Sequence, residues 1–401
     1  MAFQAPQANQ YDVVIVGGAI MGSAAAWFLS KSDTFDGSVL VVDRDMSFEH
    51  SATAQSTSCI RQQFSTDLNI QISRFGADFI TNLRRFMGDD PRVPEIGIRN
   101  FGYMYLADTA EYARDLHRRQ AVQVAAGAAT RLLTPDEIAA AYPFYALDDI
   151  VLGSINTVDE GYFDSMAVFE WMRRQAQDRG VVYLENEVVD MSVQADRVMS
   201  VTLATGAVVA CGHVVNAAGP RAAQVAALAG VGVPVEPRKR YSWVFTAEKP
   251  LDRDLPLTID PSGFHVRENG GGTYQAGGQA GPDPAVDFDD FAMDHSLWEC
   301  TVWPVLAARI PQFDALKLTH SWVGHYEMNT VDHNAIIGPH PEIDNLLFMN
   351  GFSGHGLQQA PAMGRGIAEW LSFGRYRSLD LSPFHFDRLL GAAPQVELAV
   401  I

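Results

Sequence analysis

The chain has 401 residues, of which 47% are hydrophobic and 19% charged, and this composition predicts a globular protein of one or two domains. Its formal net charge of −19 argues against binding to nucleic acids or anionic membrane surfaces. Cys59, Cys211 and Cys300 are far apart and lack metal-site spacing, which favours free thiols in a reducing compartment. Residues 1–10 have no apolar signal-peptide core, and no apolar run could span a bilayer. We therefore expect a soluble, cytoplasmic protein, with an organellar matrix as the alternative.

The first predicted element is an apolar strand at 11–16, YDVVIV, followed by a glycine turn at 17–22 and a small-residue helix start. A strand, a glycine turn and a helix in this order predict a dinucleotide site, with the pyrophosphate at the helix N-terminus. The pattern reads GxAxxG, because Ala19 replaces the usual middle glycine. A second apolar strand at 39–42 ends in Asp43, where a carboxylate can accept hydrogen bonds from a ribose 2′-OH.

The rest of the chain alternates helical and strand patterns, with β-rich stretches between them. A capping box beginning at Thr134 opens one short helix. The other helices are expected at 68–86, 111–126, 165–178, 294–310 and 359–373. Strands are expected at 101–106, 181–184, 187–193, 198–203, 211–215, 316–325 and 346–349, with a β pattern over 234–278. This alternation predicts an α/β fold with a discontinuous nucleotide-binding domain.

Two further motifs accompany the glycine turn: HVVNAAGP at 213–220 and GFSGHG at 351–356. Together the three motifs resemble the D-amino-acid oxidase (DAO) family of FAD-dependent oxidoreductases, most closely monomeric sarcosine oxidase, glycine oxidase and the small amine dehydrogenases. The resemblance implies a Rossmann-like FAD-binding domain of the glutathione-reductase type, with an inserted α+β substrate domain built on a mixed β-sheet. We expect the FAD-binding domain to comprise 1–90, 150–232 and 325–401, and the substrate domain to comprise 91–149 and 233–324.

The cofactor is expected to be FAD, held without a covalent bond. The helix opened by the third motif can stabilise negative charge on the reduced flavin, and its glycines are expected because a Cβ would hold the flavin ring away. The cofactor-binding residues expected from the motifs and the resemblance are Gly17, Gly18, Ala19, Ile20, Met21, Gly22, Asp43, Arg44, Ser56, Thr57, Ser58, Val188, Ala217, Ala218, Gly219, Gly351, Gly354, His355, Gly356, Leu357 and Gln358.

Three positions depart from the sarcosine oxidase pattern. His325 stands where that enzyme has a flavin-tethering cysteine, which excludes a cysteinyl bond there. Gln275 stands in place of the lysine that activates O₂, and a neutral amide cannot stabilise forming superoxide. Gln358 replaces a lysine that holds the substrate carboxylate, so a simple sarcosine-like substrate is in doubt.

The expected activity is oxidation of an amine, either an amino acid or an N-methyl amino acid, by hydride transfer from the α-carbon to flavin N5. The resulting imine would hydrolyse. No general base is assigned, because desolvation alone lowers the pKa of an ammonium group. The residues expected at the reaction are Arg61, Tyr241, Gln275, Tyr326 and His355, with Tyr103 as a further aromatic wall and Arg267 as a second carboxylate partner.

Oxygen, a quinone or an electron-carrier protein would accept the electrons, and the neutral Gln275 favours a dehydrogenase or a slow oxidase. Two alternatives stay open. One is oxidation of a 2-hydroxy acid on the same fold, and the other is a non-catalytic flavin-containing assembly factor.

Overall fold

The computed structural model describes residues 3–279, 281–391 and 395–400. Its first sheet has eight strands, and β1 (Gln10–Val16) pairs in parallel with β2 (Val39–Asp43) and β11 (Val208–Asn216) at its centre. The strand order is β17-β18-β11-β1-β2-β8, and the hairpin β9–β10 continues from β11. The outer strands are β8 (Val182–Glu185), β9 (Val188–Gln194), β10 (Arg197–Leu203), β17 (Ile336–Pro339) and β18 (Leu346–Asn350).

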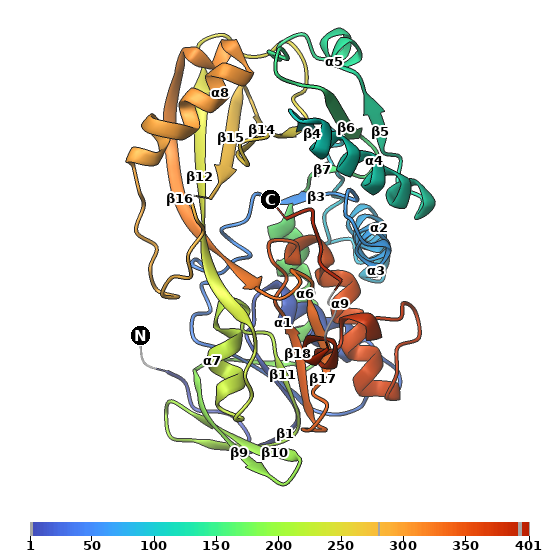
Figure 1. The fold of residues 1–401 in the computed structure, drawn as a ribbon. Helices are drawn as coiled ribbons and strands as arrows, with labels where there is room; N and C mark the ends of the chain where they lie inside the picture. The colour runs from blue at the N-terminus through green and yellow to red at the C-terminus, as the bar shows by residue number, and fades with distance from the viewer. Residues whose placement is uncertain (1–2, 280, 392–394, 401) are drawn as a thin grey trace.

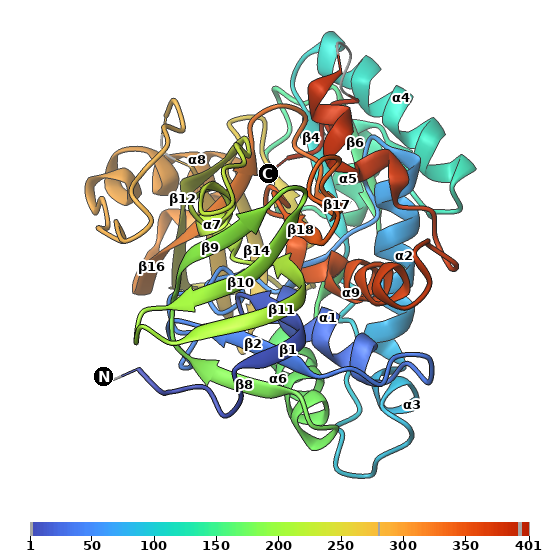
Figure 2. The ribbon, with the colours of Figure 1, turned by 90° about the horizontal axis from the view of Figure 1, so that it is seen from below.

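This sheet is buried on both faces, so its central strands read as nearly continuous apolar runs. On β1, Val13 and Ile15 point to one face, and Val14 and Val16 point to the other. Figure 2 shows the helices gathered beside the first face. They are α1 (Ile20–Ser30), α2 (Asp67–Thr81), α3 (Leu83–Phe86), α6 (Ser165–Asp178) and α9 (Gly356–Phe373). The hairpin β9–β10 and α7 (Ala222–Ala227) cover the second face.

The second sheet also has eight strands, in the order β16-β12-β15-β14-β13-β4-β6-β5. Its two longest strands, β12 (Val235–Ala247) and β16 (Leu316–Asn329), pair antiparallel along their length. They run from the part of the molecule built on the first sheet, the first lobe, into the part built on the second sheet, the second lobe (Figure 1). The remaining strands are β4 (Tyr103–Ala107), β5 (Arg131–Leu133), β6 (Leu152–Asn156), β13 (Leu257–Ile259), β14 (His265–Gly270) and β15 (Thr273–Gly278). A short pair, β3 (Cys59–Ile60) and β7 (Gly161–Tyr162), connects the lobes.

Helices α4 (Ala110–Ala125), α5 (Pro135–Ala141) and α8 (Trp303–Arg309) lie on the second lobe. The capping box at Thr134 is present, with its hydroxyl accepting from the Glu137 N–H. The helix expected over 294–310 is present as one helical run over 296–309, which a π-helix (Trp298–Val302) interrupts before α8. The Ser296 N–H donates to the Asp294 side chain at the start of this run. Pro304, which lacks an N–H group, lies in the first turn of α8 and favours this interruption.

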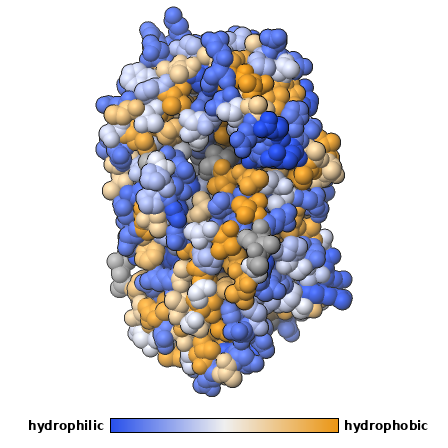
Figure 3. All heavy atoms as spheres, viewed as in Figure 1, coloured by the Kyte–Doolittle hydropathy of each residue, from blue (hydrophilic) through white to orange (hydrophobic). Residues whose placement is uncertain are grey.

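Polar and apolar side chains alternate over much of the surface (Figure 3). Apolar groups gather in the middle of the face shown there, where the C-terminal segment runs in Figure 1. Within the described ranges, no helix combines the length and the apolar character needed to cross a membrane.

Candidate cofactor and active site

A cavity of about 570 Å³ runs from the turn after β1 to the ribbon of β12 and β16. This volume falls in the range of small-molecule and cofactor sites. The three glycine-containing motifs, distant in sequence, all contribute to its lining. The predicted residues that line it are Gly17, Ala19, Ile20, Met21, Asp43, Arg44, Ser56, Thr57, Arg61, Val188, Ala217, Ala218, Gly219, Tyr241, Tyr326, Gly354, His355, Gly356, Leu357 and Gln358, together with Tyr103 and His325.

The first glycine turn brings strand and helix into close contact. Gly17 has φ +102°, and a Cβ there would collide with the carbonyl oxygen of Ala217. A Cβ on Gly22 would collide with the carbonyl oxygen of Gly17. Helix α1 then begins after Ala19, which offers no capping side chain, and no acid lies in its first turn, although the Ile20 N–H donates to the Thr53 hydroxyl at 3.3 Å. Its free N–H groups and positive dipole end therefore face the cavity, as an anionic pyrophosphate requires.

Asp43 lies at the end of β2 on the cavity wall. Its carboxylate accepts hydrogen bonds from the N–H groups of Gly18 at 2.7 Å and Asp45 at 3.0 Å. Burial raises the pKa of this carboxyl group, while the two N–H donors lower it. Each carboxylate oxygen retains a further lone pair, so the group can still accept from a ribose hydroxyl.

Replacement of Asp43 by alanine is expected to weaken FAD binding by about 1–3 kcal/mol, because it removes the ribose acceptor and leaves the Gly18 N–H without its partner. Titration of the apoprotein with FAD, followed by flavin fluorescence, measures the change. Asp43→Asn keeps one carbonyl acceptor and should lose less. Equal affinity for all three proteins would mean that Asp43 does not contact the cofactor.

The second motif supplies the opposite wall. Gly219 has φ +57°, and a Cβ there would meet none of the described atoms within 4 Å. The backbone at 217–219 is therefore open to an incoming ligand, and the side chain of Val188 adds an apolar contact beside it. This combination suits an adenosine, which has a planar apolar face and polar edges.

The third motif delivers a second helix N-terminus to the same cavity. Helix α9 begins at Gly356, earlier than the expected 359, and its N-cap His355 makes no side-chain cap bond with a described residue. The Nε2 atom of His355 is buried without a hydrogen-bond partner among the described residues. Burial and the nearby Arg61 lower the pKa of this imidazole. Two helix N-termini without an acid in the first turn and an unpaired ring nitrogen thus fit a cofactor with a pyrophosphate at one end and a polar ring at the other.

The glycine at 354 is also required by its packing against the protein. It has φ +88°, which side chains rarely adopt, and a Cβ there would collide with the ring of Tyr326. A Cβ on Gly356 would meet the Met21 side chain at 2.8 Å. Packing thus favours both glycines, and the close approach of a flavin to them stays a prediction.

Aromatic and charged side chains close the far end of the cavity. Arg61 is buried and lies over the ring of Phe64 at 4.1 Å, and its guanidinium donates to the carbonyl oxygens of Gln63 and Ala399. The guanidinium of Arg240 lies 4.4 Å from the centre of the Tyr326 ring. These contacts fix the orientation of both arginines.

The charged or titratable lining residues at this end that were not predicted as site residues include Arg240, His265 and Glu327. Burial, aided by Arg267 and Arg240, lowers the pKa of His265 to about 4, and its Nδ1 has no partner among the described residues. The one sequence signal for them was a charged or titratable residue within a predicted β-run, and this pattern is too common to single out a site.

Six predicted residues do not reach the lining: Gln275, Arg267, Gly18, Gly22, Ser58 and Gly351. Gln275 lies on β15, and its amide oxygen accepts from Arg267 at 2.6 Å. A guanidinium therefore lies beside the amide where the sequence suggested a neutral environment. The Ser58 hydroxyl bonds to Ser165 at 2.8 Å instead of facing the cavity.

A loop at 281–295 that is rich in aspartates, the acidic loop, covers one side of the cavity. Asp283 pairs with Arg240 at 2.6 Å, Asp290 with Lys239 at 2.7 Å, and Asp289 with Arg221 at 2.6 Å. The Phe291 ring of the same loop stacks on His325, with ring centroids 4.3 Å apart. These contacts tie the loop to β12, β16 and the second motif.

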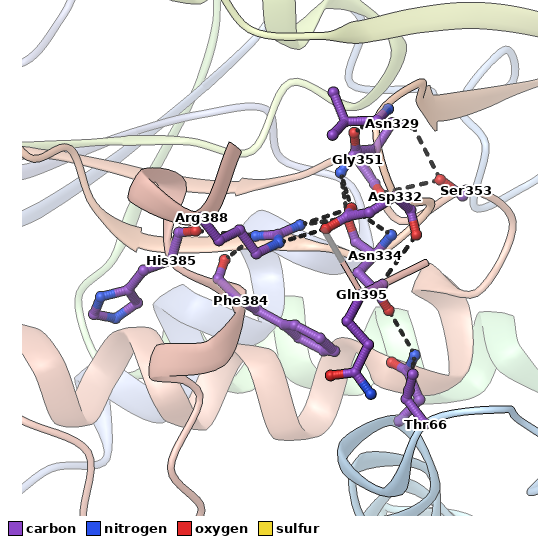
Figure 4. Close-up of polar contacts among 12 residues, drawn as sticks. Thr66, Asn329, Asp332, Asn334, Gly351, Ser353, Phe384, His385, Arg388 and Gln395 are labelled. Atoms are coloured by element: carbon purple, nitrogen blue, oxygen red, sulfur yellow. Dashed lines mark hydrogen bonds and ion pairs between the residues drawn. The ribbon is translucent and has the colours of Figure 1, made fainter. Parts of the chain in front are cut away.

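The C-terminal segment packs behind the cavity wall, where it contacts Arg61. Asp332 is 1% exposed and pairs with Arg388 at 2.7 Å, and Asn334 donates to the carbonyl oxygen of Gln395 at 2.7 Å (Figure 4). Glu397 is fully buried and accepts from the Ser65 N–H at 2.8 Å, next to the start of α2. This network places the carbonyl of Ala399 on Arg61.

Comparison with known proteins agrees with this geometry. The family model described as FAD dependent oxidoreductase, DAO, matches residues 12–370. FAD-dependent oxidoreductase domain-containing protein 1 of Xenopus laevis is 37% identical over 424 residues, covering 97% of this chain and 85% of the relative. Mitochondrial sarcosine dehydrogenase of Mus musculus is 23% identical over 397 residues, covering 95% of this chain and 42% of the relative. The crystal structure of L-proline dehydrogenase from P. horikoshii superposes with a TM-score of 0.81 at 24% identity, covering 94% and 97% of the two chains.

Proposed function

The chain belongs to the DAO family of FAD-dependent oxidoreductases, and from this membership we propose that it oxidises the C–N bond of an amino acid or N-methyl amino acid. The observation that carries the proposal is one cavity that joins two helix N-termini, neither with an acid in its first turn, to a buried end lined by Tyr103, Tyr326 and Arg61. The similarity of this chain to proteins named sarcosine dehydrogenase and L-proline dehydrogenase supports an amine substrate.

Bound FAD would supply the oxidant, by accepting a hydride at N5. The α1 N-terminus, Asp43 and the backbone at 217–219 would hold its adenosine and pyrophosphate. The α9 N-terminus would stabilise the charge of the reduced ring, because its N–H groups are fixed before the reaction. Tyr103 and Tyr326 would enclose the substrate and exclude water, and the remaining N–H groups of Arg61 would attract a carboxylate.

The test is anaerobic reduction of the purified holoprotein by a panel of N-methyl amino acids, D- and L-amino acids and 2-hydroxy acids, followed by flavin absorbance. We expect bleaching by at least one amine, with a keto acid or aldehyde and the released amine as products. Bleaching by hydroxy acids alone would replace the amine proposal, and no bleaching by any compound would favour a flavin-containing protein without turnover.

FAD is expected to leave the polypeptide on acid precipitation. His325, the residue at the tether position, stacks on Phe291, and its Nε2 lies 2.9 Å from the carbonyl oxygen of Asp290. A covalent bond through this nitrogen would break that contact. Flavin absorbance that stays with the pellet would contradict the prediction, and mass spectrometry of the intact protein is the second measurement.

We propose O₂, a quinone or an electron-carrier protein as the acceptor. Gln275 pairs with Arg267, and Arg240 lies on the cavity wall. This region therefore carries positive charge, and the neutral Gln275 alone does not favour a dehydrogenase. Stopped-flow mixing of reduced protein with air-saturated buffer distinguishes an oxidase from a dehydrogenase.

A further inference from the structure

We propose that the carboxylate of Glu327 accepts a proton from the bound ammonium substrate, so that the neutral amine can release its hydride. This inference rests on the proposed amine oxidation and names the proton acceptor of the same site.

Glu327 follows Tyr326 on β16 and lines the cavity at its ring end, with 7% of its surface exposed. Its carboxylate accepts the N–H of Gly351 at 3.0 Å, and its main-chain carbonyl accepts the N–H of Ser353 at 3.1 Å. Both donors belong to the loop that opens α9. Glu327 is therefore held at the loop where the resemblance places the flavin ring.

Burial is the main influence on the ionisation of the Glu327 carboxyl group. Burial raises the pKa of the Glu327 carboxyl group to about 8, opposed only by the Gly351 N–H, and no charge on a described residue contributes. On β12 the cations are paired with acids. The titratable and charged groups on the packed elements include Glu236, Arg238, Lys239 and Arg240 on β12, His325 and Tyr326 on β16, His355 at the start of α9, and Arg61 after β3.

The other polar groups at this end cannot serve as the acceptor. Burial raises the pKa of Tyr103 and Tyr326, so both stay protonated. Burial lowers the pKa of His265 and His355, so both are weak bases. Arginines stay protonated. The other lining carboxylates among the described residues lie at the nucleotide end or pair with Arg221 and Arg44: Asp43, Asp45, Glu187 and Asp289.

The proton transfer needs only the ammonium group of the substrate and the carboxylate of Glu327. A cationic ammonium favours the ionised form of a neighbouring carboxyl group. The N–H bond of the ammonium breaks, an O–H bond forms on Glu327, and the electron pair stays on nitrogen. This lone pair then assists departure of the α-carbon hydride to the bound flavin, which leaves an iminium for hydrolysis. A general base whose pKa lies near the operating pH suits this transfer.

The experiment compares wild type, Glu327→Gln and Glu327→Asp, with the exposed Glu299→Gln as the matched control. The fastest amine of the panel reduces each holoprotein anaerobically between pH 6 and 10. In the wild type, the rate constant divided by the substrate Kd should rise through about pH 8. The glutamine variant should lose about 10²–10⁴-fold and this inflection. The aspartate variant should keep the inflection at a lower rate, and the control should match the wild type.

A second measurement needs no turnover. Burial also raises the pKa of Glu160, to about 7, so infrared difference spectra between pH 6 and 10 should show more than one protonated-carboxyl band in the wild type, and the glutamine variant should lack the band of Glu327. An unchanged rate and pH profile in Glu327→Gln, or the absence of that band, would overturn the inference while amine oxidation itself stands. If no amine reduces the flavin, the proposed function fails, and this inference fails with it.

Discussion

Gly354→Ala is expected to yield protein with little or no bound FAD. The residue has φ +88°, where a Cβ costs about 1–2 kcal/mol, and that Cβ would also collide with the Tyr326 ring. Either the loop or Tyr326 must move, and both lie on the wall of the proposed flavin site. The ratio of flavin absorbance to protein absorbance in the purified protein measures the loss.

Gly374→Ala is the matched control. Gly374 ends α9 at φ +65°, and a Cβ there meets none of the described atoms within 4 Å. The control therefore carries the backbone cost without the collision, and should lose about 1 kcal/mol of stability while retaining its FAD. Equal flavin content in the two variants would show that the 354 loop does not shape the cofactor site.

Asp332→Ala is expected to lower the free energy of unfolding by about 3–5 kcal/mol. The carboxylate is 1% exposed, and its removal leaves the Arg388 guanidinium, itself only 15% exposed, without its ionic partner. The change also removes an acceptor from Asn329 at 2.7 Å and from the Asn334 N–H at 3.1 Å. Urea unfolding of the variant and the wild type measures the difference.

The exposed pair of Asp252 and Arg253 provides the control, because Asp252→Ala should change stability by less than about 0.5 kcal/mol. The double variant Asp332→Ala/Arg388→Ala should lose less than the sum of the two single variants, since it leaves no buried unpaired charge. Additive losses would mean that the two side chains do not interact.

Local patterns revealed the first sheet and its glycine turns. The strand at β1, the glycine turn and Asp43 lie within 34 residues of one another, and their spacing alone specifies strand, turn and helix. The expected resemblance to the DAO family and the FAD cofactor are confirmed on this basis. The sequence did not show that Gly354 also packs against a ring from another strand, β16.

Contacts made by distant segments were beyond the sequence. Arg61 is held by a carbonyl 338 positions away, and Gln275 meets Arg267 only through the register of β14 and β15. Glu327 looks like any acid in a strand until its neighbours show that it is buried. The burial and the partners of such a residue depend on the assembled sheet, and the sequence of a single strand does not show them.

The paired strands β12 and β16 also limit how the molecule can move. They pair from Val235 opposite Asn329 to Ala247 opposite Leu316, with one register shift between Val244 and Phe245, over roughly 40 Å at about 3.3 Å per residue. Moving the lobes apart at this edge would break hydrogen bonds between β12 and β16, which run through both lobes. Exchange of substrate and product is therefore easier through displacement of surface segments than through a hinge. The acidic loop over the cavity is held mainly by ion pairs, so its opening should depend on ionic strength.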